Sequence, residues 1–168
     1  MQIRRAAPAD LAAVGEVTAA AYAPFTLGPD DPYVARLRDA ASRAEQAELW
    51  VAVTDDPHGP GEVLGSVTTC PPGSPWREIA EPGEGEFRML SVAPGAQGQG
   101  VGSALVEHVL EHYRRDGARA VVMSSLVEMA AAHRLYARHG FARLPERDWS
   151  PVPDVHLIAF GTTLGGTR

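Results

Sequence analysis

The sequence predicts an α/β fold of the mixed α+β kind: one domain whose central twisted sheet has about six to seven strands and is flanked by about four helices. Short apolar runs alternate with segments of helical periodicity along the 168 residues. Strand–helix–strand units in the centre of the chain require parallel pairing, whereas turn-rich links between other strands require antiparallel pairing. Seventeen glycines and 14 prolines supply the breaks between these elements. We therefore expect a mixed sheet with helices on both faces.

The first half of the chain opens with a strand and a helix. Leu11, Val14, Val17 and Ala21 recur at helical spacing after Asp10, which is a good N-cap residue. Dense turn formers at 55–61 separate two apolar runs as a hairpin loop would. The predicted elements are a strand at 2–5, a helix from 11 to about 22, a more polar helix at 33–47, and strands at 49–54 and 63–70.

The second half continues this alternation. Val101, Leu105, Val109 and Tyr113 form the apolar stripe of a helix that ends before Gly117. The predicted elements are a loop at 71–85, a strand at 86–92, this helix from 101 onward, a buried strand at 118–125, a helix at 130–139, and closing strands at 141–149 and 155–164. Residues 1–164 then form the domain, and residues 165–168 form a flexible tail.

Composition and charge exclude several classes of protein. Apolar residues make up 45% of the chain and charged residues 21%, which are ordinary values for a soluble globular domain. No apolar run is long enough to cross a bilayer, and the first residues lack the apolar centre of a signal peptide, so we expect no membrane association. A single cysteine, Cys70, excludes an internal disulfide and favours a reducing, cytoplasmic setting. The net charge of −6 argues against a nucleic-acid partner.

Residues 92–105 contain the most informative motif. An apolar run ends at Val92, and glycines then recur at positions 98, 100 and 102 before a segment of helical periodicity. Glycines at the start of a helix let the backbone approach a ligand closely. The first N–H groups of a helix have no partner inside it, and the positive end of the helix dipole adds to their attraction for anions. We interpret residues 97–103 as a pyrophosphate-binding turn.

Other phosphate motifs fit this turn less well. A dinucleotide site requires Gly-x-Gly-x-x-Gly, but the third glycine position holds Ser103, and no acidic residue ends the next strand. A Walker loop requires Gly-Lys-Ser or Gly-Lys-Thr, which the chain lacks. The pattern Gln-x-x-Gly-x-Gly matches Gln97, Gly100 and Gly102. The alternative is a glycine-rich turn with only a structural role.

A second motif, Ala-x-x-Leu-Tyr-x-x-x-Gly-Phe, spans residues 132–141. Met129, Ala132 and Tyr136 share one face of the predicted helix there, at spacings of three and four residues. A tyrosine on an apolar face is often a core residue, and its hydroxyl then still needs a partner.

With both motifs in this order, the chain resembles the GCN5-related N-acetyltransferases, the GNAT superfamily. Leu90, Ser91 and Val92, with Pro94 and the 97–102 turn, match the first family motif, and Ala132, Leu135, Tyr136, Gly140 and Phe141 match the second. The resemblance implies a GNAT-like fold and direct transfer of an acetyl group from acetyl-CoA to an amine in a ternary complex. The cofactor-binding residues that it implies are Leu90, Ser91, Val92, Gln97, Gly98, Gln99, Gly100, Val101, Gly102, Ser103, Met129 and Ala132.

Two positions depart from the common family pattern. Many members have asparagine, a contact of the pantetheine arm, where this chain has Met129, and many have arginine where it has Gln97. Met129 leaves one expected cofactor contact open. A non-catalytic acyl-CoA-binding sensor or interaction module on the same fold is therefore the alternative function.

The implied reaction requires a neutral amine, a donor for the developing oxyanion and a proton for the leaving thiolate. An alkyl amine with a pKa near 10.4 is mostly protonated at pH 7, and freeing its lone pair costs about 4 to 5 kcal/mol. The resemblance implies that the strand at 90–92 splays from its parallel neighbour and that an N–H near Leu90 is the oxyanion donor. Tyr136 is the candidate general acid.

The candidate general base is Glu86. On a regularly alternating strand it would face the same side as Arg88, Leu90 and Val92. Glu128, just before the last predicted helix, is the other carboxylate considered. Either could instead be a solvated surface acid, and some family members use no dedicated side-chain base.

The acceptor should be a small-molecule or peptide amine that binds outside the motifs. The resemblance places one wall of its site in residues 22–33. An exposed aromatic ring near acidic residues could hold a cationic amine, or the same residues could only pack a loop. The residues considered for this are Trp76, Trp149, Asp30, Asp31 and Glu78.

Metal binding and oligomerisation receive less support from the sequence. His108 and His112 have the helical spacing of a metal pair, but no third ligand accompanies them, so we predict no metal site. Homodimers are common in the superfamily, and nothing in this chain decides for or against one.

Overall fold

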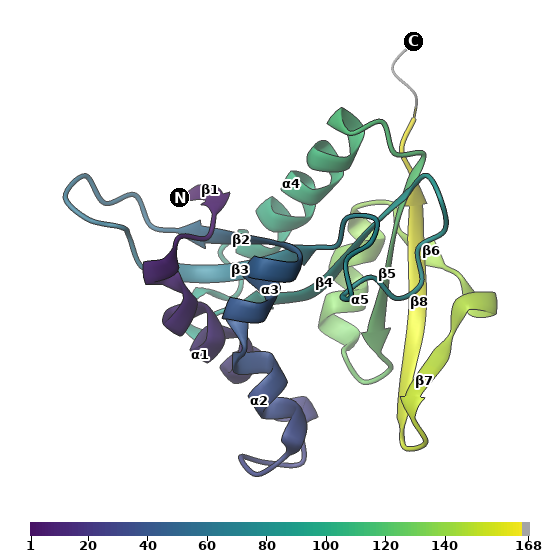
Figure 1. Cartoon of the computed structure of the whole chain (residues 1–168), viewed down its shortest axis with the longest axis horizontal. Coiled ribbons are helices and arrows are strands. Elements are labelled where there is room, and N and C mark those ends of the chain that lie inside the picture. Colours follow the sequence, from purple (N-terminus) through teal and green to yellow (C-terminus); the bar gives the residue numbers. More distant parts are fainter. Residues whose placement is uncertain (166–168) are drawn as a thin grey trace.

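The computed structural model describes residues 1–165, in which one eight-stranded sheet carries five α-helices (Figure 1). The helices are α1 (Leu11–Tyr22), α2 (Pro32–Arg38), α3 (Ala40–Gln46), α4 (Val101–Arg115) and α5 (Ala130–Arg138). The strands are β1 (Gln2–Arg5), β2 (Glu48–Val53), β3 (Val63–Thr69), β4 (Glu84–Val92), β5 (Ala120–Leu126), β6 (Ala142–Arg143), β7 (Trp149–Val152) and β8 (Val155–Thr163). The predicted fold class is confirmed. Of the predicted tail, residues 166–168 lie outside the described part of the chain.

The sheet is mixed, as the sequence predicts. Its strand order is β1-β2-β3-β4-β5-β8-β6, and β7 pairs with β8. β4 and β5 are parallel, whereas the other neighbouring strands are antiparallel. Helices lie on both faces: the hydroxyl of Ser91 in β4 faces Thr18 of α1, and the next residue, Val92, lies beside Gly102 of α4. Successive residues of this strand thus point into opposite helical layers.

Two predicted elements are divided in the structure. The helix predicted at 33–47 breaks at Asp39, whose φ and ψ of −77° and 67° are not helical. Its carboxylate caps α3 by accepting from the Ser42 N–H (3.0 Å) and hydroxyl (2.6 Å), a local bond that competes with helix continuation. The strand predicted at 141–149 is interrupted by a 3-10 turn at Pro145–Arg147, because proline has no N–H for a ladder.

Asp10 has a different role from the predicted one. It directly precedes α1, but its carboxylate makes no capping bond to that helix. It accepts instead from the Ala7 N–H (2.7 Å) and from Arg4 (2.6 Å). The other predicted elements are found with ends shifted by a residue or two, which is the usual uncertainty of helix and strand boundaries.

The main core lies between the sheet and helices α4 and α5. The predicted stripe of α4 is buried there, together with Val106 and Leu110 of the same helix. Gly85 of β4 is required at this contact, because a Cβ on it would overlap the ring of Tyr113. None of the helices within residues 1–165 is long and apolar enough to cross a membrane.

Strand β4 contains a β-bulge. The register of β3 against β4 changes between Ser66 and Thr68, so that Met89 and Leu90 together occupy one place in the ladder. Met89 has a φ of 50°, in the left-handed region that residues other than glycine seldom adopt. Compared with a regularly alternating strand, the side chains of β4 after the bulge point to the opposite face of the sheet.

The bulge overturns the expectation that Glu86, Arg88, Leu90 and Val92 share one face. Leu90 belongs to the core cluster under α4 and α5, and Val92 packs against the same cluster. Arg88 pairs with Glu78 in the loop before β4, and Glu86 accepts hydrogen bonds from that loop. The carboxylate of Glu86 and the side chain of Leu90 therefore lie on opposite sides of the sheet.

β4 and β5 part soon after they begin. Their parallel pairing covers only Glu84–Glu86 against Ala120–Val122. Beyond it, β4 pairs with β3, and β5 continues on β8 up to Leu126. The splay implied by the family resemblance is thus confirmed, and no strand within residues 1–165 covers this edge of the second half of β4.

Glu86 fixes the loop that precedes β4. Its side chain is 1% exposed, and its two carboxylate oxygens accept from the N–H groups of Glu78, Ile79 and Ala80 at 2.9 to 3.0 Å. A buried carboxylate that accepts several N–H groups is well satisfied, since each of these bonds is charge-assisted.

We expect Glu86→Gln to lower the free energy of unfolding by about 1 to 3 kcal/mol, because the NH2 of the amide cannot accept these N–H groups. Urea and thermal unfolding measure the change. The matched control is Glu62→Gln, at an exposed carboxylate before β3, which should stay within about 0.5 kcal/mol of the parent. Equal stability of the two variants would contradict the anchoring role of Glu86.

Candidate active site

The glycine turn forms an exposed bend at the start of α4. Gly98 and Gly100 have φ values of 74° and 83°, in the left-handed region, and Gly100 is the N-cap of α4. Among the described residues, no hydrogen-bond acceptor is paired with the backbone N–H groups of 97–103, and the first turn of α4 carries no acidic side chain. An anion bound here would meet free donors and the positive end of the α4 dipole.

Several residues of the turn stabilise its conformation or its packing and do not present a side chain to a ligand. Gln99 folds back and donates from Nε2 to the Gly95 carbonyl at 3.0 Å. A Cβ at Gly102 would come within 3.0 Å of Leu135 Cδ2, so this glycine permits the contact between α4 and α5. Val101 is buried in the core and can offer a ligand only its backbone. The predicted anion site is therefore built mainly from main-chain donors.

Gln97 and Ser103 are the side chains of the turn that could reach a phosphate. Gln97 is exposed. The Ser103 hydroxyl shares a 2.8 Å hydrogen bond with Nε2 of His139, at the end of α5. Because a hydroxyl has one donor and two acceptor positions, Ser103 keeps the capacity for a further bond.

Leu90, Ser91 and Val92 lie on the part of β4 that has left β5. The apolar side chains of Leu90 and Val92 pack in or against the main core. The hydroxyl of Ser91 lies 3.0 Å from that of Ser66 in β3. The Leu90 carbonyl accepts a long hydrogen bond of 3.4 Å from the hydroxyl of Tyr22. The side chains are committed to packing, so the backbone of this segment is the part available to a ligand.

Tyr136 lies on α5 and faces the main core. It is 4% exposed, and its ring centroid is 5.9, 5.9 and 6.1 Å from those of Phe87, Phe141 and Phe160. The Tyr136 hydroxyl makes no hydrogen bond with residues 1–165. It is also not one of the fully buried polar atoms that lack a partner, so its oxygen reaches an accessible space. Burial raises the pKa of the phenol well above its ordinary value, and it keeps its proton at neutral pH.

The rest of the second motif shapes both ends of α5. Met129 is the half-buried N-cap residue and forms no side-chain capping bond. Ala132 and Leu135 pack against the main core beside Tyr136. Gly140, with a φ of 82°, ends the helix. Ala132 thus lies in the same core cluster as Tyr136, and Met129 directly precedes the helix that carries both.

The two carboxylates considered as bases occupy different environments. Glu86 is occupied by loop N–H groups and faces away from Leu90. Glu128 is exposed in the turn before α5. Glu86 instead positions Glu78, whose N–H lies 3.0 Å from both oxygens of the Glu86 carboxylate. Glu78 is therefore the carboxylate that this part of β4 holds in place.

Glu78 belongs to a group of side chains that the sequence did not reveal: Tyr33, Arg36, Trp76, Glu78 and Arg88, hereafter the Trp76 cluster. Of the two roles considered for Trp76, an exposed ring for a cationic amine or a residue that packs a loop, the structure supports the second. It is 5% exposed, and the guanidinium groups of Arg36 and Arg88 already lie over it, at 4.5 and 5.5 Å from the ring. Contacts between residues so distant in sequence leave no local pattern that could have indicated them.

Charges within the Trp76 cluster are close together and poorly solvated. Arg88 Nε lies 2.5 Å from Glu78 Oε1. Burial raises the pKa of Glu78, although the charge of Arg88 lowers it in part. Burial also raises the pKa of Tyr33, against smaller lowering effects of Arg88 and Arg36. Of the other two predicted acceptor acids, Asp31 caps α2 by accepting from the Tyr33 N–H at 2.9 Å, and Asp30 is exposed.

Arg43 of α3 lies behind this cluster and is fully buried. Its Nη1 donates to the carbonyls of Leu37 (2.9 Å) and Arg36 (3.4 Å) and contacts Met89 Sδ at 3.2 Å. Its Nη2 donates to Thr18 Oγ1 at 3.3 Å. Within residues 1–165 it has no carboxylate partner. Burial lowers the pKa of Arg43 to about 10, so the group is charged at neutral pH.

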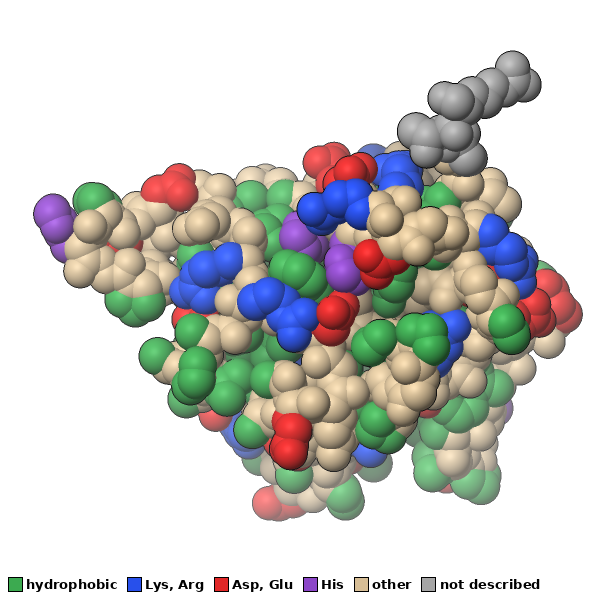
Figure 2. Space-filling model, turned by 45° about the horizontal axis from the view of Figure 1, so that its top comes forward, with side chains coloured by type: hydrophobic (Ala, Val, Ile, Leu, Met, Phe, Trp, Pro, Cys, Tyr) green, Lys and Arg blue, Asp and Glu red, His purple; other side chains and the backbone are tan. Residues whose placement is uncertain are grey.

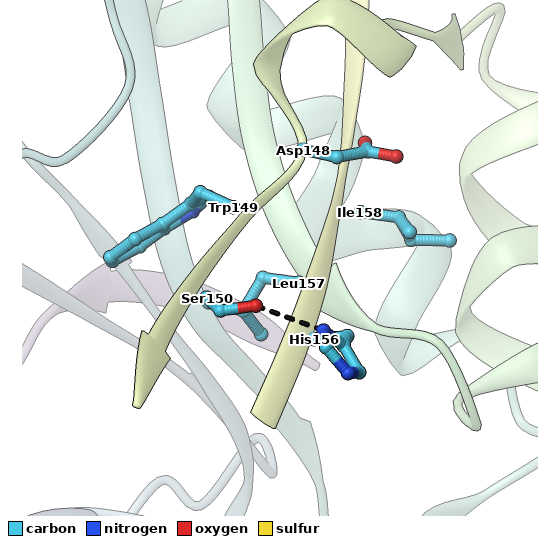
Figure 3. A pocket seen from close by; sticks show the side chains of 6 residues that line it. All are labelled: Asp148, Trp149, Ser150, His156, Leu157 and Ile158. Atoms are coloured by element: carbon cyan, nitrogen blue, oxygen red, sulfur yellow. Dashed lines mark hydrogen bonds between the residues drawn. The ribbon is translucent and has the colours of Figure 1, made fainter. Parts of the chain in front are cut away.

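The last hairpin carries a shallow hollow of about 310 Å³ (Figure 3). Ser150 and His156 are joined across its two strands by a 2.9 Å hydrogen bond. Trp149, one of the predicted acceptor residues, donates from Nε1 to the Ser124 hydroxyl of β5 at 3.1 Å. The residues that line the hollow are Asp148, Trp149, Ser150, His156, Leu157 and Ile158. The hairpin is thereby tied to the part of β5 that has left β4.

The histidines considered for a metal lie in a charged surface region. His112 is 3.0 Å from Glu48 and 3.5 Å from Asp116, and the ring of Trp50 packs against both His108 and His112. In residues 1–165 no three His, Cys, Asp or Glu side chains are grouped so that they could hold a metal ion. On the face shown in Figure 2, acidic and basic side chains are mixed.

Comparison with known proteins relates this geometry to a family. The profile of the Acetyltransferase (GNAT) family matches residues 16–141. The chain is 36% identical to mycothiol acetyltransferase of Cellulomonas flavigena over 146 residues. This alignment covers 79% of this chain and 39% of that protein. The chain thus spans about two fifths of the length of this curated relative.

Solved structures share the fold over nearly the whole chain. The ribosomal-protein-S18-alanine N-acetyltransferase of Escherichia coli has a TM-score of 0.70 at 19% identity, covering 99% of this chain and 96% of that one. An acetyltransferase of Salmonella typhimurium, solved with its cofactor acetyl-CoA, has a TM-score of 0.65 at 24% identity, covering 100% and 96%. By the family match over three quarters of its length, this chain belongs to the acetyltransferase (GNAT) family.

Proposed function

We propose that the protein transfers an acetyl group from acetyl-CoA to an amine, directly and in a ternary complex. The observation that carries this proposal is the set of unpartnered N–H groups at 97–103, beside the part of β4 that β5 has left. The Salmonella typhimurium relative in fold is a structure with acetyl-CoA, and the Cellulomonas flavigena relative in sequence is named an acetyltransferase. We also propose a cytoplasmic location and a small-molecule or peptide amine as acceptor.

The residues of the turn and of β4 would hold the co-substrate. The N–H groups of 97–103 suit the linked phosphates of coenzyme A. The uncovered edge of β4 at 90–92 suits the amide groups of an extended pantetheine arm, as in strand addition. When bound, acetyl-CoA supplies the thioester that the amine attacks. The N–H of Leu90 would then serve as donor to the developing oxyanion.

Tyr136 would donate the proton that the leaving sulfur requires. Its ring is fixed by aromatic neighbours, and its hydroxyl reaches accessible space without a protein partner. Its raised pKa keeps the phenol protonated, as a general acid must be before the reaction.

Glu78 would accept the proton of the amine, with Glu86 as the residue that positions it. Its raised pKa brings the carboxylate closer to the basicity that a general base needs at neutral pH. Direct transfer leaves no role for Cys70, which is fully buried and whose thiol pKa burial raises to about 12.

Gly100→Ala should weaken coenzyme A binding by about tenfold or more, because a Cβ disfavours the left-handed N-cap from which the N–H groups point. Gly117→Ala is the matched control, since Gly117 has a φ of 74° and equally open surroundings beyond the other end of α4. Both variants should lose about 1 to 2 kcal/mol of stability. Calorimetry with coenzyme A measures the affinity. Equal affinities for the two variants would contradict the assignment of the anion site.

Tyr136→Phe should lower kcat by about 100-fold or more while leaving the Kd for coenzyme A within about twofold of the parent. The ring contacts persist in phenylalanine, and the lost hydroxyl has no protein partner, so folding should be unaffected. Thiol release from acetyl-CoA with the best amine of a screen measures kcat. An unchanged kcat would remove Tyr136 from the mechanism.

Glu78→Gln should abolish the acid limb of the kcat profile. In the parent, kcat should fall as the pH drops through the raised pKa of Glu78, because only the ionised carboxylate accepts a proton. No alkaline loss is expected up to about pH 10, because Tyr136 stays protonated there. The variant should show a low, pH-independent kcat in the acid range, and Glu62→Gln should keep the parent profile. An acid limb retained in Glu78→Gln would assign the base elsewhere.

A further inference from the structure

We propose that the acceptor amine carries a carboxylate, as a free amino acid does, and that Arg36 with Arg88 recognises it. This inference rests on the proposed function and names the substrate class of the same site. It follows from how the charged groups of the Trp76 cluster are paired and stacked.

Arg36 presents a guanidinium that forms no ion pair with residues 1–165, although the charges of Arg36 and Glu78 attract each other. The side chain is exposed, lies over Trp76 at 4.5 Å, and has no carboxylate within salt-bridge distance among residues 1–165. Its neighbour on the same helix, Arg38, is instead paired with Glu16 at 3.0 Å. Stacking on an aromatic ring orients the planar guanidinium and leaves its edge, with several N–H groups, free for a carboxylate.

The charged groups around Arg36 are already committed to other partners. Arg88 lies over the same ring and is paired with Glu78, and the buried Arg43 donates to the Arg36 carbonyl. The carboxylates nearby are Glu78, Glu86 and Asp39: Glu78 is paired with Arg88, Glu86 accepts N–H groups of the loop before β4, and Asp39 caps α3. Each of these carboxylates thus has a partner other than Arg36. The exposed guanidinium of Arg36 therefore keeps its N–H groups available to an anion.

The cluster adjoins the segment where acetyl transfer would occur. Arg88 directly precedes the bulge at Met89, and Arg43 contacts Met89 from behind. The next residue, Leu90, accepts from Tyr22 on the same helical layer. A small molecule with its carboxylate at Arg36 and Arg88 would therefore carry its amine toward Glu78 and the uncovered edge of β4.

The test compares free L-amino acids with their α-amides as acceptors. Amidation removes the negative charge and also lowers the pKa of the amine, so that more of the amide is in the reactive form. Without carboxylate recognition the amides would be the better acceptors. We expect the best free acid to exceed its amide by about tenfold or more in kcat/KM. The thiol reagent reports only released coenzyme A, because Cys70 is buried.

Arg36→Gln should reduce the preference for the acid by about 10- to 100-fold, as expected for a charge-assisted bond. Arg38→Gln is the matched control on the same helix and should keep the preference. Thermal unfolding verifies that both variants fold. Amides that react as well as acids, or a preference that survives in Arg36→Gln, would overturn the proposal while leaving acetyl transfer intact.

A binding measurement separates this proposal from the proposed function. Free amino acids and their amides are titrated calorimetrically into the protein already saturated with coenzyme A, whose own binding is measured first. Acid binding without amide binding, lost in Arg36→Gln, would support the recognition even if no thiol is released. The absence of binding by every acid would overturn it. Failure of coenzyme A to bind would instead refute the proposed function.

Discussion

Strand β4 is hydrogen-bonded to β5 over only three residues, and the site depends on this early parting. A strand inside a sheet has its N–H and C=O groups satisfied on both sides. Among the strands of the described residues, the second half of β4 is paired with β3 alone. The groups on its other side are open to an extended chain of amides. The bulge at Met89 adds a second effect, because it turns Leu90 and Val92 into the main core and directs Arg88 to the opposite layer. One irregular strand thus separates a co-substrate side from an acceptor side.

The buried guanidinium of Arg43 stabilises the acceptor side of β4. Arg43 donates to the last carbonyls of α2, where the negative end of a helix dipole favours a cation. A buried guanidinium is costly unless its donors are satisfied. Carbonyls, a hydroxyl and the sulfur of Met89 surround Nη1 and Nη2 of Arg43, whereas its Nε has no hydrogen-bond partner within residues 1–165. The break at Asp39 makes this arrangement possible, since it lets α3 turn so that Arg43 faces the end of α2. The bulge and the broken helix are therefore connected through one side chain.

Local patterns in the sequence predict the elements that depend on local physics. The alternating glycines, the apolar stripe of α4 and the Ala132–Tyr136 spacing all indicate contacts between neighbours in the chain, and the structure has them. The bulge was not predictable, because methionine carries no signal for a left-handed conformation. The assignment of Glu86 as a base assumed regular alternation and so failed to anticipate its role as a loop anchor. The sequence could not decide between exposure and packing for Trp76, because the arginines that cover it come from α2 and β4, far away in sequence.

The net charge is another property from which the sequence alone does not predict the site. A net charge of −6 suggests a cationic ligand if the molecule is treated as one body. Exposed charges separated by more than about 8 Å are largely screened at physiological salt, so a bound molecule responds mainly to the few groups around it. Near the parted strands, carboxylates are committed to caps and backbone N–H groups, as Asp31, Asp39 and Glu86 show. Arg36, which lies over the ring of Trp76, forms no ion pair within residues 1–165. An acidic protein can therefore still present a cationic group to a ligand, and the pairing of each charge is a better guide to its ligand than the sum of charges.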